Sequence, residues 1–403
     1  MKIIHTADWH IGKRLHNFEL DEDFQLFIDW LTQIIQQEQV ELILIAGDVF
    51  DFSNPSSHSR QLFYNTMIRL QQLNCKIIIT GGNHDSPAML NAPKEILNTI
   101  NISVLGGMPN DEAEAILPVQ NQQNKIELVV HAIPFLREVD LRKSTDGISY
   151  EDRIKVMQNG IENIYKKSID LGKRNYPHLP HIAMGHLFTA GVSPSDSERE
   201  IQIGNQAKFE AQRLGNGFDY IALGHIHKPQ KVNAAVPAYY SGSPLPLSFS
   251  ERTDEKRILL LDTAKGFEPK SIPVPNFRKL IRLNGCLNEI QEKLKNLEVD
   301  STLPSLLEVI LEEKNYDTAT EDTFLQIINT FKHPHAKIVK SRMIFENRVL
   351  GAHELFAQHE HLNDLKPVEI LDKMIASQKE LKEEDKNHLR QVFHQLLEEI
   401  QSE

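Results

Sequence analysis

Short apolar, β-branched runs alternate with segments of helical periodicity between residues 2 and 261, and this alternation limits the fold more than any other feature. The segments 21–37 and 58–73 carry apolar side chains at helical spacing, and Ser56 or Ser57 is placed to cap the second segment. Strands that alternate with helices predict a layered α/β domain. The predicted strands are 2–6, 42–46, 76–80, 102–105, 128–133, 181–184, 220–223, 238–240 and 257–261.

A Pro-punctuated stretch at 271–276 predicts a linker to a second region. Beyond it, residues 279–345 show strand, helix, strand, helix and strand patterns, which predict a small α/β domain. From residue 351 the chain is polar and helical in pattern, with one apolar stripe that a short helix pair cannot bury alone. The predicted domains are a core at 1–275, a small domain at 276–350 and a helical tail at 351–403. The stripe consists of Leu389, Val392, Phe393, Leu396, Leu397 and Ile400.

The charge balance excludes binding to nucleic acid through bulk electrostatics, because the formal net charge is −12. Any contact with DNA must therefore come from local basic residues, bound cations or a partner protein. We expect Cys75 and Cys286 to be buried free thiols, which fits a reducing compartment. No apolar run is long enough to span a membrane and the first residues lack a signal-peptide pattern, so a cytoplasmic location is expected.

Metal-binding side chains occur where the predicted strands end. The strand 76–80 is followed by Gly81-Gly82-Asn83-His84-Asp85, in which two glycines allow a sharp turn. An amide, an imidazole and a carboxylate are thus delivered side by side. Ligands of α/β sheets bind at the carboxyl ends of the strands, so this stretch predicts a site.

Four further strand ends carry side chains of the same kind, and together with Asn83 they suit two divalent ions that share one carboxylate. Nitrogen and oxygen ligands without thiolate favour Mn, Fe or Zn over Ca. Any one such motif is usually a turn or a satisfied polar contact, but five in succession predict a metal site. His131 stands outside them and is expected to be a hydrogen-bonded core histidine. The four further groups are Asp8-x-His10, Gly47-Asp48-Val49-Phe50-Asp51, Gly185-His186 and Gly224-His225-Ile226-His227.

In this order, the five groups resemble the signature of the calcineurin-like metallophosphoesterases, D-x-H, G-D-x-x-D, G-N-H-D, G-H and G-H-x-H. More narrowly, segments 5–12, 47–51 and 240–249 resemble the SbcD family of bacterial nuclease subunits. Segment 365–371 resembles the SbcD element that grips the coiled-coil base of the ATPase subunit SbcC. The resemblance implies an α/β fold: a four-layer αββα metallophosphoesterase sandwich, a small α/β capping domain of DNA-binding type and a C-terminal helical tail that binds SbcC.

The same resemblance implies a role for each residue of the site. It places Asp8, His10, Asp48 and His227 around one metal ion, and Asp48, Asn83, His186 and His225 around the other. Two divalent ions are implied, with Mn²⁺ expected and Asp48 as the bridge. His84 is implied to be catalytic, as a proton donor near the leaving oxygen, and Asp85 to orient His84 or a ligand. For Asp51 two roles stay open, a metal ligand or a group that holds His10 or a water.

The function implied by the resemblance is that of a DNA nuclease working with SbcC in repair, recombination and replication. It would act as a 3′→5′ exonuclease on duplex ends and as an endonuclease on single strands and hairpins. A homodimer within a heterotetramer is implied, with no membrane attachment. ATP hydrolysis is implied to belong to SbcC, and no P-loop motif occurs in this chain.

Two other functions stay open on the same core. A phosphatase or a cyclic-nucleotide phosphodiesterase would use a similar metal pair, but phosphatases of this superfamily usually show G-D-x-x-D-R-G and G-N-H-E. Here Phe52 follows Asp51 and Asp85 follows His84, so the phosphate-gripping Arg is absent. Small phosphodiesterases also lack the long C-terminal extension. An inactive scaffold that only recruits a partner is the third reading, although every expected ligand position is filled.

Overall fold

The computed structural model describes residues 1–141, 150–195, 197–198 and 209–345, together with 368, 371–372, 375, 386–393 and 397. The chain falls into two compact units. The first comprises residues 1–15 and 19–277, and the second comprises residues 16–18 and the chain from 278 onward. Within the described residues, no helix is both long enough and apolar enough to cross a bilayer.

The first unit contains two six-stranded sheets, and the first of these has the order β14-β13-β1-β4-β5-β6. Strands β1, β4, β5 and β6 are parallel, whereas β13 is antiparallel to β1 and β14 is antiparallel to β13. Four of the five residues of β1 and of β5, and all of β4, are buried, which explains the runs of isoleucine and leucine within them. The bounds are β1 Lys2–Thr6, β4 Leu42–Ala46, β5 Lys76–Thr80, β6 Ile102–Leu105, β13 Arg257–Asp262 and β14 Lys270–Pro273.

The second sheet has the order β11-β12-β10-β9-β8-β7. Its four inner strands β8, β9, β10 and β12 are parallel, and the edge strands β7 and β11 are antiparallel to their neighbours. The carboxyl ends of several parallel strands are therefore available in each sheet to carry functional loops. The bounds are β7 Ile116–Gln120, β8 Ile126–Ala132, β9 His181–His186, β10 Tyr220–Gly224, β11 Gln230–Lys231 and β12 Ala238–Tyr240.

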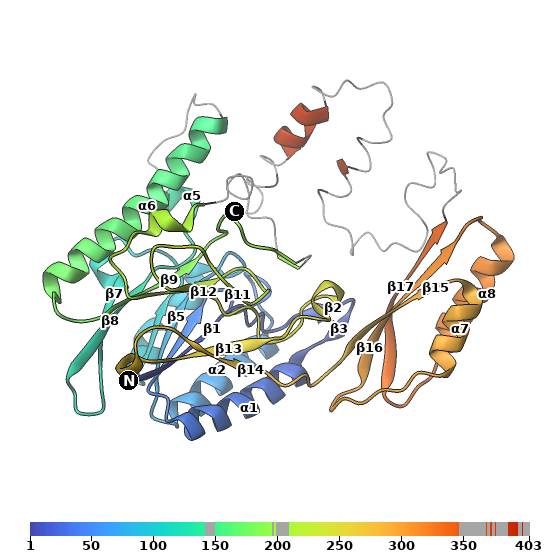
Figure 1. Cartoon of the computed structure of the whole chain (residues 1–403), viewed down its shortest axis with the longest axis horizontal. Coiled ribbons are helices and arrows are strands. Elements are labelled where there is room, and N and C mark those ends of the chain that lie inside the picture. Colours follow the sequence, from blue (N-terminus) through green and yellow to red (C-terminus); the bar gives the residue numbers. More distant parts are fainter. Residues whose placement is uncertain are drawn as a thin grey trace. The chain divides into compact units, whose positions relative to one another are not determined.

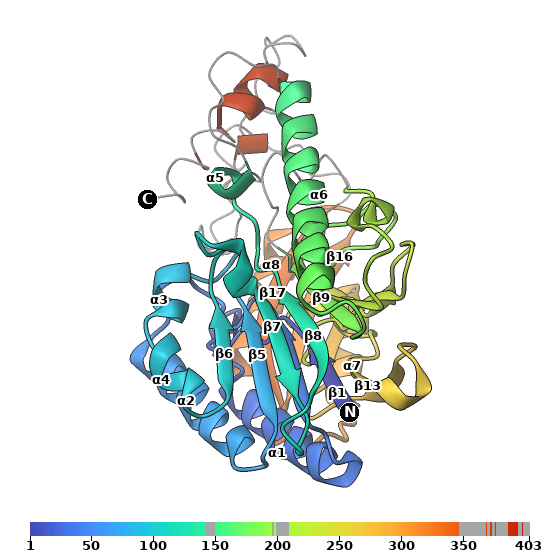
Figure 2. The ribbon, with the colours of Figure 1, turned by 90° about the vertical axis from the view of Figure 1, so that its left-hand side faces the viewer.

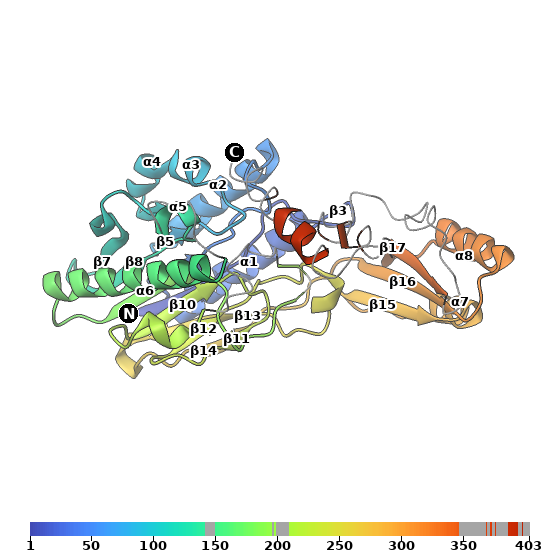
Figure 3. The same ribbon diagram turned by 90° about the horizontal axis from the view of Figure 1, so that it is seen from above.

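Helices cover the outer face of each sheet, which gives the unit four layers. Helices α1 and α2 share one buried core with the first sheet, α6 shares another with the second sheet, and a third core lies between the sheets. Figure 2 shows α2, α3 and α4 on one side of the strands and α6 on the other, and Figure 3 shows α6 running beside β8. The predicted αββα sandwich is confirmed. The helices are α1 Asp21–Glu38, α2 Ser57–Gln71, α3 Pro87–Asn91, α4 Lys94–Asn98, α5 Glu138–Leu141 and α6 Tyr150–Asn175, and β2 Arg14–Leu15 pairs with β3 Phe18–Glu19.

Local sequence signals explain where α1 and α2 begin. The side chain of Ser56 accepts a hydrogen bond of 3.0 Å from the backbone N–H of Ser59, so Ser56 is the cap of α2. The first turn of α1 is acidic, which complements the positive end of the helix dipole. Both helices thus start within one residue of the predicted positions.

Three parts of the first unit differ from the sequence-based expectation. Helix α6 was not predicted, although Ile161, Ile164 and Tyr165 recur at helical spacing and pack on the second sheet. Strand β7 was not predicted either. The expected linker at 271–276 was wrong in its first half, because residues up to Pro273 continue β14. This strand lies at the edge of the sheet, where proline is tolerated because its missing N–H does not remove a hydrogen bond to a neighbouring strand.

The second unit has one three-stranded parallel sheet, ordered β15-β16-β17, with α7 and α8 on the same side of it (Figure 1). Its core contains Leu307, Val309 and Leu311 of β16 and Phe324 of α8. Cys75 of the first unit is buried as expected, but Cys286 is only half-buried because it occupies the N-cap of α7. The bounds are β15 Leu280–Gly285, α7 Leu287–Lys295, β16 Ser305–Glu313, α8 Thr318–Thr330 and β17 Ala336–Phe345.

The predicted helical tail at 351–403 lies mostly outside the described residues, and so does nearly all of segment 365–371. Residues 386–393 are helical, as the sequence pattern predicts. Within them Leu389 and Val392 are 42% and 39% exposed. These two members of the apolar stripe are therefore available for a contact.

Two buried histidines predict how stability depends on pH. His131 is a core histidine as expected, bonded to Ser168 at 2.7 Å and to His181 at 2.9 Å. Burial lowers the pKa of His131, and likewise that of His5, to about 3. Below pH ~6.5 the unfolded chain binds these protons and the folded chain does not, so the free energy of unfolding falls as pH drops toward 3.

We expect His131→Gln to weaken this dependence by up to about 1.4 kcal/mol per pH unit, the contribution of one proton. The measurement is urea denaturation between pH 7.5 and pH 5, with His178→Gln at an exposed position as the control. Equal slopes for His131→Gln and the wild type would contradict the assignment.

Candidate metal centre

The predicted site residues meet at the carboxyl ends of strands from both sheets. Asp8 and His10 follow β1, Asp48 follows β4, and Asn83, His84 and Asp85 follow β5. His186 is the last residue of β9, and His225 and His227 follow β10. Asn83 is half-buried, and each of the other side chains is at most 3% exposed. The nine residues therefore form one buried site.

Three groups of possible ligand atoms occur among the described residues, and two of them share one carboxylate; the third consists of His10, Asp51 and His84. Ligand atoms of Asp8, His10, Asp48 and His227 lie within 4.8 Å of one another, and so do those of Asp48, His186 and His225. The Oδ1 atom of Asn83 lies 3.0 Å from Nε2 of His186 and 3.2 Å from Nδ1 of His225, so it joins the second group. Asp48 is the only member common to both groups within the described chain.

Several of these side chains are carried on strained backbone. Asp8, His10, Asp48 and His225 have φ values of 54°, 44°, 47° and 99°, a region that non-glycine residues rarely adopt. Such strain persists only where the surrounding structure holds it, and it is common at functional sites. The glycine at Gly82 is required for space, because a Cβ there would lie 2.1 Å from Oδ1 of Asp48.

The donor set fits divalent cations. Oδ2 of Asp8 and Nε2 of His225 are buried without a hydrogen-bond partner, which is costly unless another group satisfies them. The Nε2 atoms of His10 and His227 face each other at 3.1 Å. Burial alone would lower the pKa of His186, but the carboxylates of Asp48 and Asp8 raise it to about 9, so a proton holds this place when no cation does.

Hydrogen bonds from the far side of two of the imidazoles fix their orientation. Nδ1 of His186 donates to the carbonyl oxygen of Ala46 at 3.0 Å, and Nδ1 of His10 donates to Oδ1 of Asp51 at 3.1 Å. In both rings Nε2 is thereby left to face the centre. This arrangement favours the role of Asp51 as a group that holds His10, and Lys13 pairs with the same carboxylate oxygen at 3.1 Å.

His84 stands beside the first group. Its Nδ1 donates to the backbone oxygen of Asp51 at 2.8 Å, and its ring centroid is 4.7 Å from that of His10. Its own backbone N–H donates to Oδ1 of Asp48 at 2.9 Å. The backbone of the β5 loop thus positions the carboxylate that the two groups share.

Asp85 ties two loops of the site together. Its carboxylate accepts backbone N–H bonds from Gly82 at 2.8 Å and from Val49 and Phe50 at 3.0 Å each. Burial, aided by the charge of Asp48, raises the pKa of Asp85 to about 6. Asp85 therefore links the loops that follow β4 and β5, and this link fixes the position of Asp48 relative to His84.

Sequence reasoning missed the side chains that hold His227. Nδ1 of His227 is 2.6 Å from the hydroxyl of Ser197, which in turn donates to the buried carboxylate of Glu251, and the N–H of His227 donates to Glu198 at 2.8 Å. Lys256 pairs with Glu251 at 2.5 Å. These partners come from distant loops, and the segment 240–249 singled out in the sequence ends before Glu251, so no local pattern pointed to them.

We expect Ser197→Ala to weaken binding of the cation next to His227 by about 10–100-fold, the usual effect of removing a partner that orients a ligand. Calorimetric titration of the chelator-stripped protein with Mn²⁺ measures this. Ser193→Ala, at an exposed serine nearby, is the matched control and is expected to bind as the wild type does. Unchanged affinity in Ser197→Ala would show that Ser197 does not orient His227.

Residues 1–229 match the calcineurin-like phosphoesterase family, which covers more than half of the 403-residue chain. The fold and the buried His/Asp site thus define a calcineurin-like metallophosphoesterase with a divalent-metal site. Residues 276–379 match a second family, the Type 5 capsule protein repressor C-terminal domain.

Curated relatives give a narrower assignment. The SbcD subunit of the nuclease SbcCD from Escherichia coli strain K12 is 32% identical over 400 residues, which are 98% of this chain and 97% of the relative. The SbcD subunit of Rhodobacter capsulatus is 33% identical over 291 residues, 70% of this chain and 71% of the relative. That of Bacillus subtilis is 26% identical over 369 residues, 90% and 91% of the two chains. The chain belongs to the SbcD family, the SbcD subunits of the nuclease SbcCD.

Proposed function

We propose that this protein hydrolyses DNA phosphodiester bonds with two divalent cations held about Asp48. The observation that carries the proposal is that Asp48 belongs to both ligand groups while the imidazole of His84 stands beside them. Two cations so placed supply an activated water and neutralise the charge of the phosphate. Membership of the nuclease family supports DNA as the substrate.

The protein residues then divide into three tasks. The cations are held by Asp8, His10, Asp48 and His227 on one side and by Asp48, Asn83, His186 and His225 on the other. Asp51 and Ala46 orient two of the imidazoles, and Asp85 holds the two loops together. His84 donates a proton to the leaving oxygen, so that the strand end departs as a neutral hydroxyl. Imidazole and carboxylate donors without thiolate suit Mn, Fe or Zn, and Mn²⁺ is proposed from the resemblance to the family.

The wider assembly follows from the family. We propose that the tail at 351–403 binds an SbcC-type ATPase, that the domain at 276–350 contributes to DNA binding, and that two copies act in a heterotetramer. The net charge of −12 supports a partner-dependent DNA interaction, since this chain does not attract DNA by itself. Activity as a 3′→5′ exonuclease and a hairpin endonuclease, in a reducing cytoplasm that keeps Cys75 and Cys286 as thiols, completes the proposal.

A comparison of substrates tests this proposal against the two alternatives. We expect Mn²⁺-dependent cleavage of hairpin DNA, little hydrolysis of a phosphomonoester, and complete loss of cleavage when a chelator removes the metal. The assay uses the purified protein with and without SbcC and ATP. Hydrolysis of the monoester alone would indicate a phosphatase, and no hydrolysis of either substrate, even with SbcC, would indicate an inactive scaffold.

A further inference from the structure

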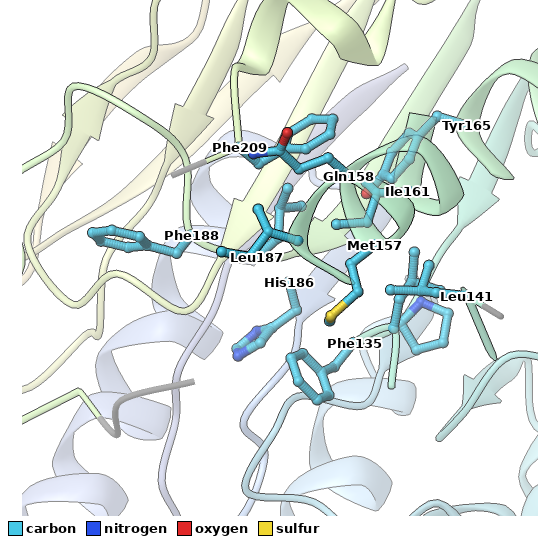
Figure 4. Close-up of a pocket in the computed structure, with 13 residues that line it drawn as sticks. Phe135, Leu141, Met157, Gln158, Ile161, Tyr165, His186, Leu187, Phe188 and Phe209 are labelled. Atoms are coloured by element: carbon cyan, nitrogen blue, oxygen red, sulfur yellow. The ribbon is translucent and has the colours of Figure 1, made fainter. Parts of the chain in front are cut away.

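An apolar pocket adjoins the proposed metal centre in the first unit. It lies between α6 and the segments that follow β8 and β9, and His186 forms part of its wall (Figure 4). The space is about 610 Å³ when its open mouth is included. The nuclease mechanism described above uses only His186 among the residues of this wall.

The lining is aromatic and apolar, which favours a flat, uncharged occupant. Phe135 meets the ring of His186 edge-on at 6.2 Å between centroids, and Tyr165 and Phe209 lie deeper. The hydroxyl of Tyr165 is satisfied by the backbone oxygen of Met184 at 3.2 Å. Figure 4 shows Met157 of α6 reaching toward Phe135 and His186. Apart from His186, no lining residue offers a cationic partner to an anionic group.

Besides His186, the lining residue with a polar group left to bind an occupant is Gln158. Its Oε1 accepts a hydrogen bond of 3.1 Å from Arg213, so the amide NH₂ is the group that remains as a donor. Every DNA base has an acceptor on its exposed edge. A single donor amid aromatic rings therefore suits base stacking without preference for one base.

We propose that this pocket receives the unpaired nucleobase next to the scissile phosphate. The inference rests on the proposed function: a phosphate bound to cations held by Asp48 and His186 would lie beside the pocket, because His186 belongs to both. The base must leave its stack and its partner strand to enter. Frayed duplex ends and hairpin loops both present such a base, which gives the two kinds of cleavage one common requirement.

Binding of two phosphomonoesters tests the pocket without relying on hydrolysis. In the presence of Mn²⁺, the wild type is expected to bind deoxyadenosine 5′-monophosphate about 5- to 150-fold more tightly than deoxyribose 5-phosphate, the factor for one base–aromatic stack. Met157→Trp, which fills the pocket, is expected to remove this difference. Val156→Trp changes the preceding residue of α6, which is 37% exposed, and is expected to keep it.

Cleavage of an oligonucleotide with an abasic residue beside the scissile bond gives a second readout. The wild type is expected to cleave it about 5- to 150-fold more slowly than the intact strand, and Met157→Trp to cleave both strands at the same slow rate. Equal affinity of the wild type for the two monoesters, or equal cleavage of the two oligonucleotides, would overturn the proposal, and neither result depends on how Met157→Trp folds. Release of inorganic phosphate from the nucleotide would instead count against the nuclease function.

Discussion

Replacement of Asp48 by Asn is expected to abolish nuclease activity and to remove both cations. Asp48 is the carboxylate that the two ligand groups share, and its Oδ2 lies 3.3 Å from His186 and 3.6 Å from His10. An amide has no charge with which to bridge two divalent ions. The loss of affinity should therefore exceed the ~10–100-fold that loss of an outer partner causes. Metal content after dialysis against Mn²⁺, measured by mass spectrometry, gives the result.

Asp51→Asn is the matched control for Asp48→Asn. Asp51 lies in the same loop, but it orients His10 from outside the two groups. The Asp51→Asn variant should bind Mn²⁺ about 10–100-fold more weakly than the wild type, and both metal sites should still be occupied at high Mn²⁺ concentration. If Asp48→Asn retained both ions at the affinity of the wild type, the shared-carboxylate arrangement would be wrong.

His84→Gln is expected to lower the turnover of DNA by about 10²–10⁴-fold while metal content and substrate affinity stay unchanged. The reason is that His84 belongs to neither shared-carboxylate group and is held by the backbone oxygen of Asp51. In the proposed mechanism its ring gives a proton to the departing oxygen. Single-turnover kinetics on hairpin DNA, together with the metal content of the variant, measure the effect.

A diester with a p-nitrophenolate leaving group tests the role of His84 as an acid. This leaving group departs without a proton, so His84→Gln should lose much less activity on it than on DNA. His58→Gln, at a ring that is 64% exposed on α2, should resemble the wild type on both substrates. An equal loss for His84→Gln on both would show that His84 stabilises charge rather than donating a proton.

Local sequence patterns predict much of the site. Each of the nine residues follows or ends a strand that is recognisable by its apolar sequence, and parallel strands present their carboxyl ends at one edge. For this reason the convergence of Asp8, Asn83 and His225 could be predicted from their positions in the sequence. The three strands missed at sheet edges, β7, β11 and β14, carry polar residues among or in place of apolar ones, so periodicity gave no signal for them.

By itself, the amino-acid sequence determined the layered α/β core, the chemical types of the ligands and the strand ends that carry them, because these depend on local periodicity and on glycines at turns. Only the tertiary structure decided that Asp85 bonds to the β4 loop, that Asp51 orients His10, and that Ser197 and Glu251 support His227. It also decided that α6 forms an apolar wall beside His186. These relations join residues far apart in the chain, and their distances follow from the packing of two sheets rather than from any local pattern.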